Sequence, residues 1–237
     1  MASLEDIPDN FYVGQGKILR TSFTWLNQGR SIEDWVHHIC STFRCERYEA
    51  VFHITKITYD MQSLRNTFPK FEGIYMRCFA DEPSDHDIQN AQNILRAFLP
   101  YVENVRLSGV PLKENLYIQH IGMANLKEFN VESRNPKFDD ILTWNVKCCT
   151  INAHRFSFRD LNCFFKLWKK GSNPKLKCLL VHGLNIPDWN VLMKGLQEEE
   201  AERQKEYTIQ NCYGIRAKIT SHNVPPILVC VEFTVSN

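Results

Sequence analysis

The sequence lacks several features that mark common classes of protein. Its 237 residues contain no apolar run of about 18 residues that could span a bilayer, and the first residues lack the apolar centre of a signal peptide. The formal net charge is only +1, so no excess of positive charge indicates binding to nucleic acid or to an anionic membrane. We therefore expect an intracellular chain, cytoplasmic or nuclear, whose partners include neither nucleic acid nor a membrane.

Catalytic and cofactor-binding signatures are also missing. The chain has no Gly-x-Ser-x-Gly, no P-loop, no His-Glu-x-x-His and no Gly-x-Gly-x-x-Gly motif. A thiol hydrolase would need a cysteine beside a histidine, and two pairs could serve, Cys178 with His182 and Cys163 with His154. We interpret these cysteines as parts of a strand and a helix. The sequence predicts that the protein is not an enzyme and uses no cofactor, with a Cys/His thiol hydrolase as a remote alternative.

Nine cysteines are present, but their spacing fits neither a zinc module nor a disulfide framework. No Cys-x-x-Cys pair occurs and the total is odd. Most lie where an apolar residue would serve, so we expect reduced, buried thiols. One group of histidines and cysteines near the start has no standard zinc spacing, and we expect no metal there. The group comprises His37, His38, Cys40, Cys45 and His53.

A strand-like pattern of apolar residues recurs along the chain. Three full copies have four apolar positions, the third and fourth separated by a single residue. Two further copies match less fully, and the first copy is degenerate. The third positions of all the copies lie 20 to 31 residues apart. This period is typical of leucine-rich-type repeats, in which one short strand and one helix stack on their neighbours. The sequence thus predicts an α/β fold, a leucine-rich-repeat-like solenoid of short parallel strands and helices. The third positions are Val51, Ile74, Val105, Phe129, Cys149 and Leu179.

Helix signals occupy the intervals between these strands. Residues 84–87 and 157–160 each form a capping box, in which a serine and an aspartate three residues later cap a helix start. Gly171 supplies a left-handed cap at the end of the second helix, and Pro174 prevents its continuation. Shorter helices are predicted over residues 112–121 and 138–144.

The two ends differ from the middle. A helix over residues 32–43 would cover the first repeat. Near the other end, a helix that begins at Trp189 is expected to run into the charged stretch 198–206. Strands would then close the far end of the sheet as a β-hairpin cap. These strands are predicted over residues 207–209, 215–219 and 227–235.

No linker rich in glycine, serine or proline divides the chain. We therefore expect an N-terminal extension of residues 1–30 followed by one domain over residues 31–237. Within it, the repeats would span about 45–186 and the C-terminal cap about 187–237.

One face of the predicted sheet would remain open, because side chains alternate across a strand. If the third and fourth apolar positions point inward, one outward row holds Phe52, Tyr75, Arg106, Asn130, Thr150 and Leu180. The next outward row holds Ile54, Arg77, Ser108, Glu132, Asn152 and His182. Tyrosine and arginine are residue types that anchor interfaces. The predicted protein-binding residues are Tyr75, Arg77, Arg106, Asn130, Glu132, Asn152 and His182, and a merely solvated sheet surface is the alternative.

Three blocks in the second half resemble the central signature of the type 2 F-box-associated domain, a family expanded in nematodes. The blocks are Asp160-Leu161-Asn162, Phe164-Phe165-Lys166-Leu167-Trp168 and Gly171-Ser172-Asn173-Pro174-Lys175-Leu176. Residues 32–43 and 207–217 are more weakly similar. The signature has structural explanations, a capping box, an apolar helix face and a helix stop, for all but Asn162. For Asn162 we predict a buried hydrogen bond to a neighbouring repeat.

The resemblance implies the substrate-recruiting part of an F-box protein. In that family the F-box docks on the Skp adaptor of a cullin-RING ubiquitin ligase, and the associated domain holds the target. Residues 1–30 lack the Leu-Pro-x-Glu-x-x-x-x-Ile pattern of an F-box. The expected partners are a protein substrate or regulator, together with Skp and a cullin if an F-box is supplied. The alternative is an F-box-less interaction regulator with no ligase role.

Overall fold

The structure is a computed structural model of the whole chain. It describes residues 32–44, 48–57, 60–67, 71–112, 118–132, 136–152, 156–184, 188–196, 199–200, 206–224 and 228–236. The predicted N-terminal extension lies outside these ranges. Within the described part of the chain, no helix has the length and apolar character needed to cross a bilayer.

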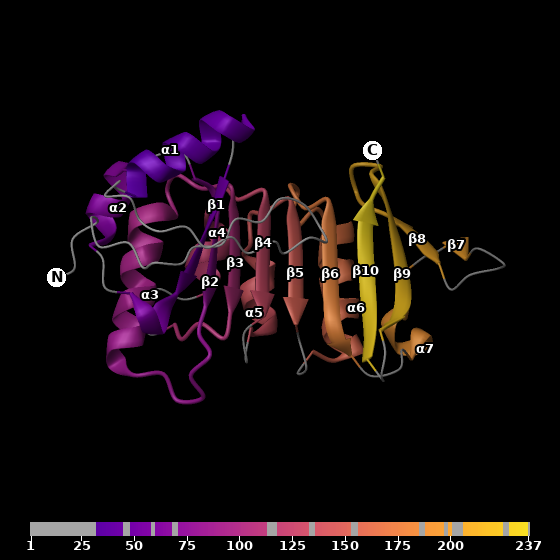
Figure 1. The fold of residues 1–237 in the computed structure, drawn as a ribbon. Coiled ribbons are helices and arrows are strands. Elements are labelled where there is room, and N and C mark those ends of the chain that lie inside the picture. The colour runs from indigo at the N-terminus through magenta and orange to yellow at the C-terminus, as the bar shows by residue number, and fades with distance from the viewer. Residues whose placement is uncertain are drawn as a thin grey trace.

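Six strands pair in parallel and in chain order, which forms the larger part of the sheet (Figure 1). A parallel pairing requires a crossover connection, and helical segments occupy these crossovers. The strands are β1 (Tyr48–His53), β2 (Phe71–Arg77), β3 (Asn104–Ser108), β4 (Glu128–Glu132), β5 (Cys148–Asn152) and β6 (Cys178–Leu184). The helical segments are η1 (Ile54–Lys56), α2 (Met61–Thr67), α3 (Asp85–Phe98), α4 (Ile118–Met123), α5 (Phe138–Leu142) and α6 (Phe158–Lys169), preceded by α1 (Ile32–Phe43).

The C-terminal strands extend the same sheet with antiparallel pairings. The strand order is β1-β2-β3-β4-β5-β6-β10-β9-β8-β7, so the last strand lies between β6 and β9. The mixed α/β class and the antiparallel C-terminal strands are as predicted, whereas the solenoid description stays a prediction. The remaining elements are α7 (Trp189–Leu192), β7 (Glu199–Glu200), β8 (Tyr207–Gln210), β9 (Arg216–Val224) and β10 (Leu228–Val235).

The core lies between the sheet and the helices of one face. Figure 1 shows α5 and α6 behind the strands. In β2 to β6 the third and fourth apolar positions of the repeat pattern are all buried, as the alternation predicts. These inward residues are Ile74, Met76, Val105, Leu107, Phe129, Val131, Cys149, Ile151, Leu179 and Val181.

The predicted register of β1 is wrong by one residue. Val51 lies opposite Tyr75 and is 54% exposed, while Phe52 and Ile54 are buried. The Phe52 ring packs against the ring of Phe98 in α3, with centroids 5.4 Å apart. The larger aromatic side chain, Phe52, is buried in place of Val51. Because alternate residues of a strand point to opposite faces, this shift of one residue turns the predicted inward residues outward and the predicted outward residues inward. Phe52 and Ile54 therefore leave the predicted outward rows, and Val51 and His53 take their places.

The helix boundaries follow the local chemistry that the sequence predicts. The Ser84 side chain accepts from the Asp87 backbone N–H, and the Asp87 carboxylate accepts from the Ser84 N–H at 2.9 Å. Ser157 and Asp160 repeat this box at the start of α6. At the end of α6, Gly171 has φ of 96° and donates to the Trp168 carbonyl, while the Ser172 N–H donates to that of Leu167.

Helix α7 is shorter than predicted. It ends at Leu192, and Glu199–Glu200 form strand β7, so the helix does not continue into the charged stretch. Gly195 has φ of 72°, a left-handed conformation that interrupts a helix. Helices α1 and α5 begin at the predicted residues, and α4 lies across the end of its predicted range. The side chains of the expected inward face of α1, and residues 113–117 before α4, lie outside the described part.

Candidate protein-binding surface

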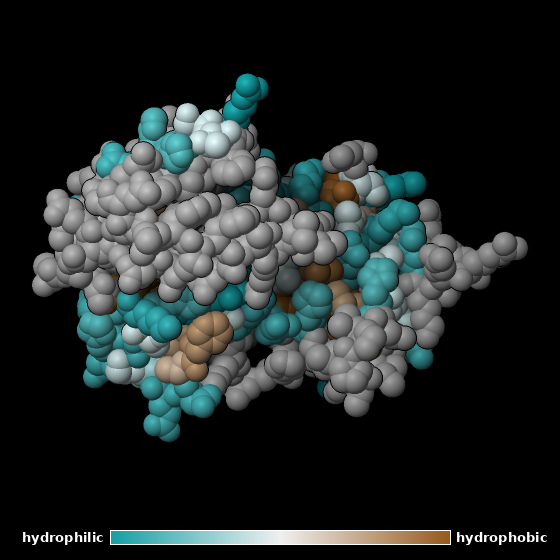
Figure 2. Space-filling model, viewed as in Figure 1, coloured by the Kyte–Doolittle hydropathy of each residue, from teal (hydrophilic) through white to brown (hydrophobic). Residues whose placement is uncertain are grey.

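The sheet face opposite the core, called here the outer face, carries rows of side chains that the strand register aligns. The central row runs through β1 to β6 and continues into β10. Figure 2 shows this side of the molecule, where the described part is mainly hydrophilic and brown areas are small. The central row is Val51, Tyr75, Arg106, Asn130, Thr150, Leu180 and Glu232.

Tyr75, Arg77 and Arg106 form a cluster at the centre of β2 and β3, called here the arginine–tyrosine cluster. Arg106 lies directly opposite Tyr75 in the register. The guanidinium carbons of Arg77 and Arg106 lie 4.2 Å and 5.1 Å from the centroid of the Tyr75 ring. Both distances are within the range of a cation–π contact, so one ring orders two cationic side chains. The sequence predicts this juxtaposition correctly, and its role in binding stays a prediction.

Apolar groups flank the cluster. Phe79, just after β2, is 70% exposed, and its ring centroid lies 6.0 Å from the Arg77 guanidinium carbon. The His53 ring lies 5.7 Å from the same phenyl ring. With the exposed Val51 beside Tyr75, the cluster combines positive charge with apolar surface, which is the composition of many interface anchors.

A small hollow adjoins the cluster, and the sequence reasoning missed it. Gly73 lies in its row between Glu49 and Asn104, and a Cβ atom added there would lie 3.0 Å from the Asn104 Cβ and 3.1 Å from the Glu49 Oε1. Neighbouring atoms therefore already fill the space above Gly73, which is not one of the residues that line the hollow. No short sequence motif could have indicated the hollow, because its lining comes from four strands, β1 to β4. The hollow is lined by Glu49, Ile74, Tyr75, Asn104, Val105, Arg106, Glu128 and Asn130.

The other predicted binding residues lie on the outer face in two places. Asn130 adjoins Arg106 in the central row, and Glu132 is exposed at the end of the same strand. Asn152 and His182 are register partners on β5 and β6, three and four strands from β2. The predicted binding residues are therefore divided into a largely charged group over β2 to β4 and the separate pair Asn152 and His182. Only the group over β2 to β4 adjoins the hollow.

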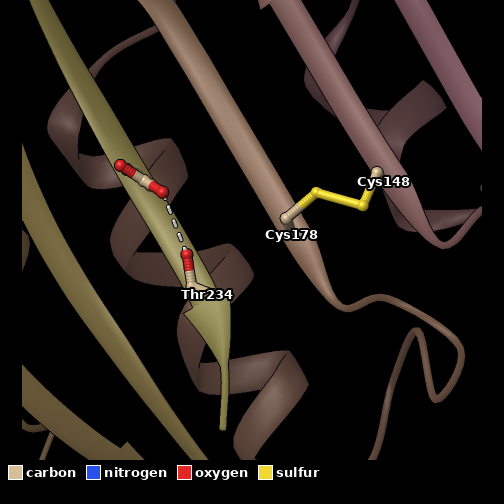
Figure 3. Close-up of a disulfide and its surroundings, with 4 residues drawn as sticks. Cys148, Cys178 and Thr234 are labelled. Carbon is tan, nitrogen blue, oxygen red and sulfur yellow. Dashed lines mark hydrogen bonds between the residues drawn. A yellow bond between two sulfur atoms is a disulfide. The ribbon is translucent and has the colours of Figure 1, made fainter.

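Two cysteines on the outer face are joined, which corrects the expectation that all thiols are reduced. Cys148 and Cys178 are register partners with Cα atoms 4.6 Å apart, and they form a disulfide between β5 and β6 (Figure 3). Thr234 lies opposite Cys178 on β10. The cysteine spacing alone does not indicate this pair, whereas the repeat that aligns Cys149 with Leu179 also places Cys148 beside Cys178. Cys149, the neighbour of Cys148 in the sequence, is buried.

The arrangement of the cysteines separates one of the two cysteine–histidine pairs considered for a thiol hydrolase. Cys178 is bonded to Cys148, and His182 lies four residues further along the same strand, about 13 Å away. Burial raises the pKa of the Cys149 thiol well above its ordinary value. Burial and the nearby Glu232 carboxylate raise the pKa of Cys230 to about 11. A raised pKa keeps a thiol protonated and weakly nucleophilic near neutral pH. His154, the partner considered for Cys163, lies outside the described residues.

No group of three or more histidine, cysteine, aspartate or glutamate side chains within the described ranges is arranged to hold a metal ion. Of the histidine and cysteine group near the start, His53 instead contacts the Phe79 ring on the outer face. Cys45 lies outside these ranges.

The signature residues of α6 and its following turn have structural contacts. Asn162 is buried, and its amide donates to the carbonyl oxygens of Leu192 at 2.7 Å and Lys194 at 3.0 Å. A buried hydrogen bond is present as predicted, but its acceptors lie at the end of α7 in the predicted C-terminal cap, not in a neighbouring repeat. Asn173, with φ of 51°, donates to the carbonyls of Ile141 and Trp144 at the end of α5. Leu161, Phe164, Phe165, Trp168 and Leu176 are buried, whereas Pro174 is exposed.

These features define a mixed α/β protein whose outer sheet face carries charged and polar side chains. A family model described as F-box associated matches residues 117–181, which contain α4, β4, α5, β5, α6 and the first part of β6. This match includes all three signature blocks and confirms the resemblance to the F-box-associated domain. Comparison with curated proteins and with solved structures gives no match.

Proposed function

We propose that the chain is a protein-binding module that recognises substrates for an F-box/cullin-RING ubiquitin ligase. The match of residues 117–181 to the F-box associated family is the observation that carries this proposal. The matched segment consists of helices and strands whose signature residues make structural contacts. The family signature therefore supports a scaffold, and specificity belongs to the exposed residues of the outer face.

The outer face offers a surface suited to a protein partner. Tyrosine and arginine are enriched among the residues that dominate interface energies, and here one tyrosine ring orders two arginines. The sheet is continuous across ten strands, so the backbone under this face is fixed by the register. A rigid platform of this kind lowers the entropy cost of binding.

Affinity purification of the tagged chain from its own cells, followed by mass spectrometry, tests the ligase role. Recovery of the Skp adaptor and a cullin together with other specific proteins would support the ligase role, and would show that an F-box contact is made although residues 1–30 lack the F-box pattern. Recovery of a specific partner without Skp or cullin would overturn the ligase role and leave a regulator that acts by binding alone. An alkaline-phosphatase bait prepared in the same way identifies proteins that are retained nonspecifically.

A further inference from the structure

The two arginines of the cluster retain their capacity for strong hydrogen bonds. Within the described residues, neither Arg77 nor Arg106 forms an ion pair with a carboxylate, although Lys127 and Lys218 do. A guanidinium stacked on an aromatic ring still presents its N–H groups at its edge, where a carboxylate can accept two parallel bonds. Among the residues that the structure describes, the cluster therefore lacks the anion that such groups most favour.

The charges of the outer face also restrict where an acidic partner can lie. Glu49 and Glu128 lie in the row before the arginine–tyrosine cluster, at the starts of their strands. Successive rows along a strand are about 7 Å apart. A partner's carboxylate placed over the arginines therefore lies one row away from Glu49 and Glu128, whereas a carboxylate placed over the hollow would be repelled by these two glutamates. Apolar surface lies beside the cluster at Val51 and Phe79, and the exposed Glu132 lies in the row of Arg77, two strands away on β4.

We propose that the arginine–tyrosine cluster binds a protein segment in which acidic residues alternate with apolar ones. Its carboxylates bind Arg77 and Arg106, and its apolar side chains contact Tyr75, Val51 and Phe79. This inference rests on the proposed function, since it states the chemistry of the partner that the outer face recognises. Charge complementarity and the apolar rim together favour this partner over a purely acidic chain or a nucleic acid.

Fluorescence anisotropy of labelled peptides tests the inference directly. The probe is a short peptide in which glutamates flank leucines, and its matched controls replace glutamate with glutamine or leucine with serine. The intact chain is expected to bind the probe about tenfold or more tightly than the glutamine peptide, because each charged hydrogen bond contributes strongly. Binding of the serine peptide is expected to be weaker than that of the probe.

Protein variants locate the binding. Arg77→Gln with Arg106→Gln should abolish the preference for the glutamate peptide, and Arg77→Lys with Arg106→Lys should retain part of it. The control Arg96→Gln with Arg159→Gln removes two exposed arginines on helices and should leave binding unchanged. Circular dichroism verifies that each variant is folded.

Several results would overturn the inference. Equal affinity of the chain for the glutamate and glutamine peptides would do so. An equal loss of affinity for the glutamate peptide in the Arg77→Gln/Arg106→Gln variant and in the Arg96→Gln/Arg159→Gln control would also do so. Tighter binding of a phosphoserine peptide or of an oligonucleotide would show a different ligand. If protein capture in cells still depended on Arg77 and Arg106 while the glutamate peptide showed no preference, the inference would fail and the proposed binding function would stand.

Discussion

The side-chain amide of Asn162 donates a hydrogen bond of 2.7 Å to the backbone carbonyl of Leu192, thirty residues further along the chain. The carbonyl belongs to the last residue of α7, where a helix leaves its carbonyls without partners inside the helix. Asn90 in α3 makes a comparable bond of 3.0 Å to the carbonyl of Ile54 in η1. In both places a buried asparagine of a capped helix fixes a short helical segment beside it.

Replacement of Asn162 by alanine should lower the free energy of unfolding by about 1–3 kcal/mol, because it leaves two backbone carbonyls without this donor. Urea denaturation followed by circular dichroism measures the change. The control Asn93→Ala alters an exposed asparagine of α3 and should cost no more than about 0.5 kcal/mol. A loss no larger than that of the control would contradict the structural role of Asn162.

Replacement of Trp168 by alanine should lower stability by about 3–5 kcal/mol, the cost expected for removing a buried large aromatic side chain. Its ring contacts the Phe233 ring of β10 edge to face, with centroids 5.0 Å apart. The ring of Phe165 stacks on the same phenylalanine at 5.5 Å. A thermal melt by circular dichroism gives the readout, with Lys170→Ala as an exposed control. An unchanged melt in Trp168→Ala would show that α6 does not pack as described.

Alkylation of the folded chain at pH 8 should distinguish three kinds of cysteine. Iodoacetamide should modify the exposed Cys163 and Cys212 first, whereas Cys149 and Cys230 should stay unmodified because they are buried and their pKa values are raised.

Cys148 and Cys178 should be recovered from the same unreduced sample as one linked peptide, and they should be alkylated only after reduction. Peptide mass spectrometry reads all of these sites. Rapid modification of Cys149 in the folded chain, or alkylation of Cys178 without reduction, would contradict the assignment.

Asp87 should make stability depend on pH in the acid range. Hydrogen bonds from the Ser84 side chain and backbone hold the pKa of Asp87 below its ordinary value of 3.8. A carboxylate whose pKa is depressed by folding stabilises the folded state above its unfolded pKa, and this contribution is lost as the pH falls through the folded pKa.

The Asp87→Asn variant should therefore be less stable than the unaltered chain at pH 7, with a difference that shrinks as the pH is lowered below 3.8. Urea denaturation at a series of pH values measures it, and Asp139→Asn, in an exposed first-turn position, is the control. A difference that is independent of pH would be inconsistent with the capping role of the carboxylate.

Much of the fold follows from local sequence patterns. The apolar alternation predicts β2 to β6 and their inward residues, and the serine–aspartate pairs predict the starts of α3 and α6. These predictions hold because each depends on residues a few positions apart. The register of β1 does not follow in this way, since Val51 and Phe52 are both apolar and only the contact of Phe52 with Phe98 decides between them.

The parts of the surface that sequence could not predict depend on neighbours distant in the chain. The cluster of Tyr75, Arg77 and Arg106 was predicted because a regular repeat aligns adjacent strands. The hollow was not, because its lining residues come from four different strands, β1 to β4. The disulfide of Cys148 and Cys178 was missed for a different reason: the repeat that aligns Cys149 with Leu179 also places these two cysteines side by side, but the spacing of the cysteines alone does not reveal it.

The most direct test of the account is capture of protein partners by the outer face. The tagged chain, its Arg77→Glu/Arg106→Glu variant and an Arg96→Glu/Arg159→Glu control would be purified from the same cells and compared by quantitative mass spectrometry. All three should be folded, because the four arginines lie outside the core. The account predicts that the control retains the partners of the unaltered chain and that the Arg77→Glu/Arg106→Glu variant loses them. Equal recovery of the same partners by both variants would contradict it.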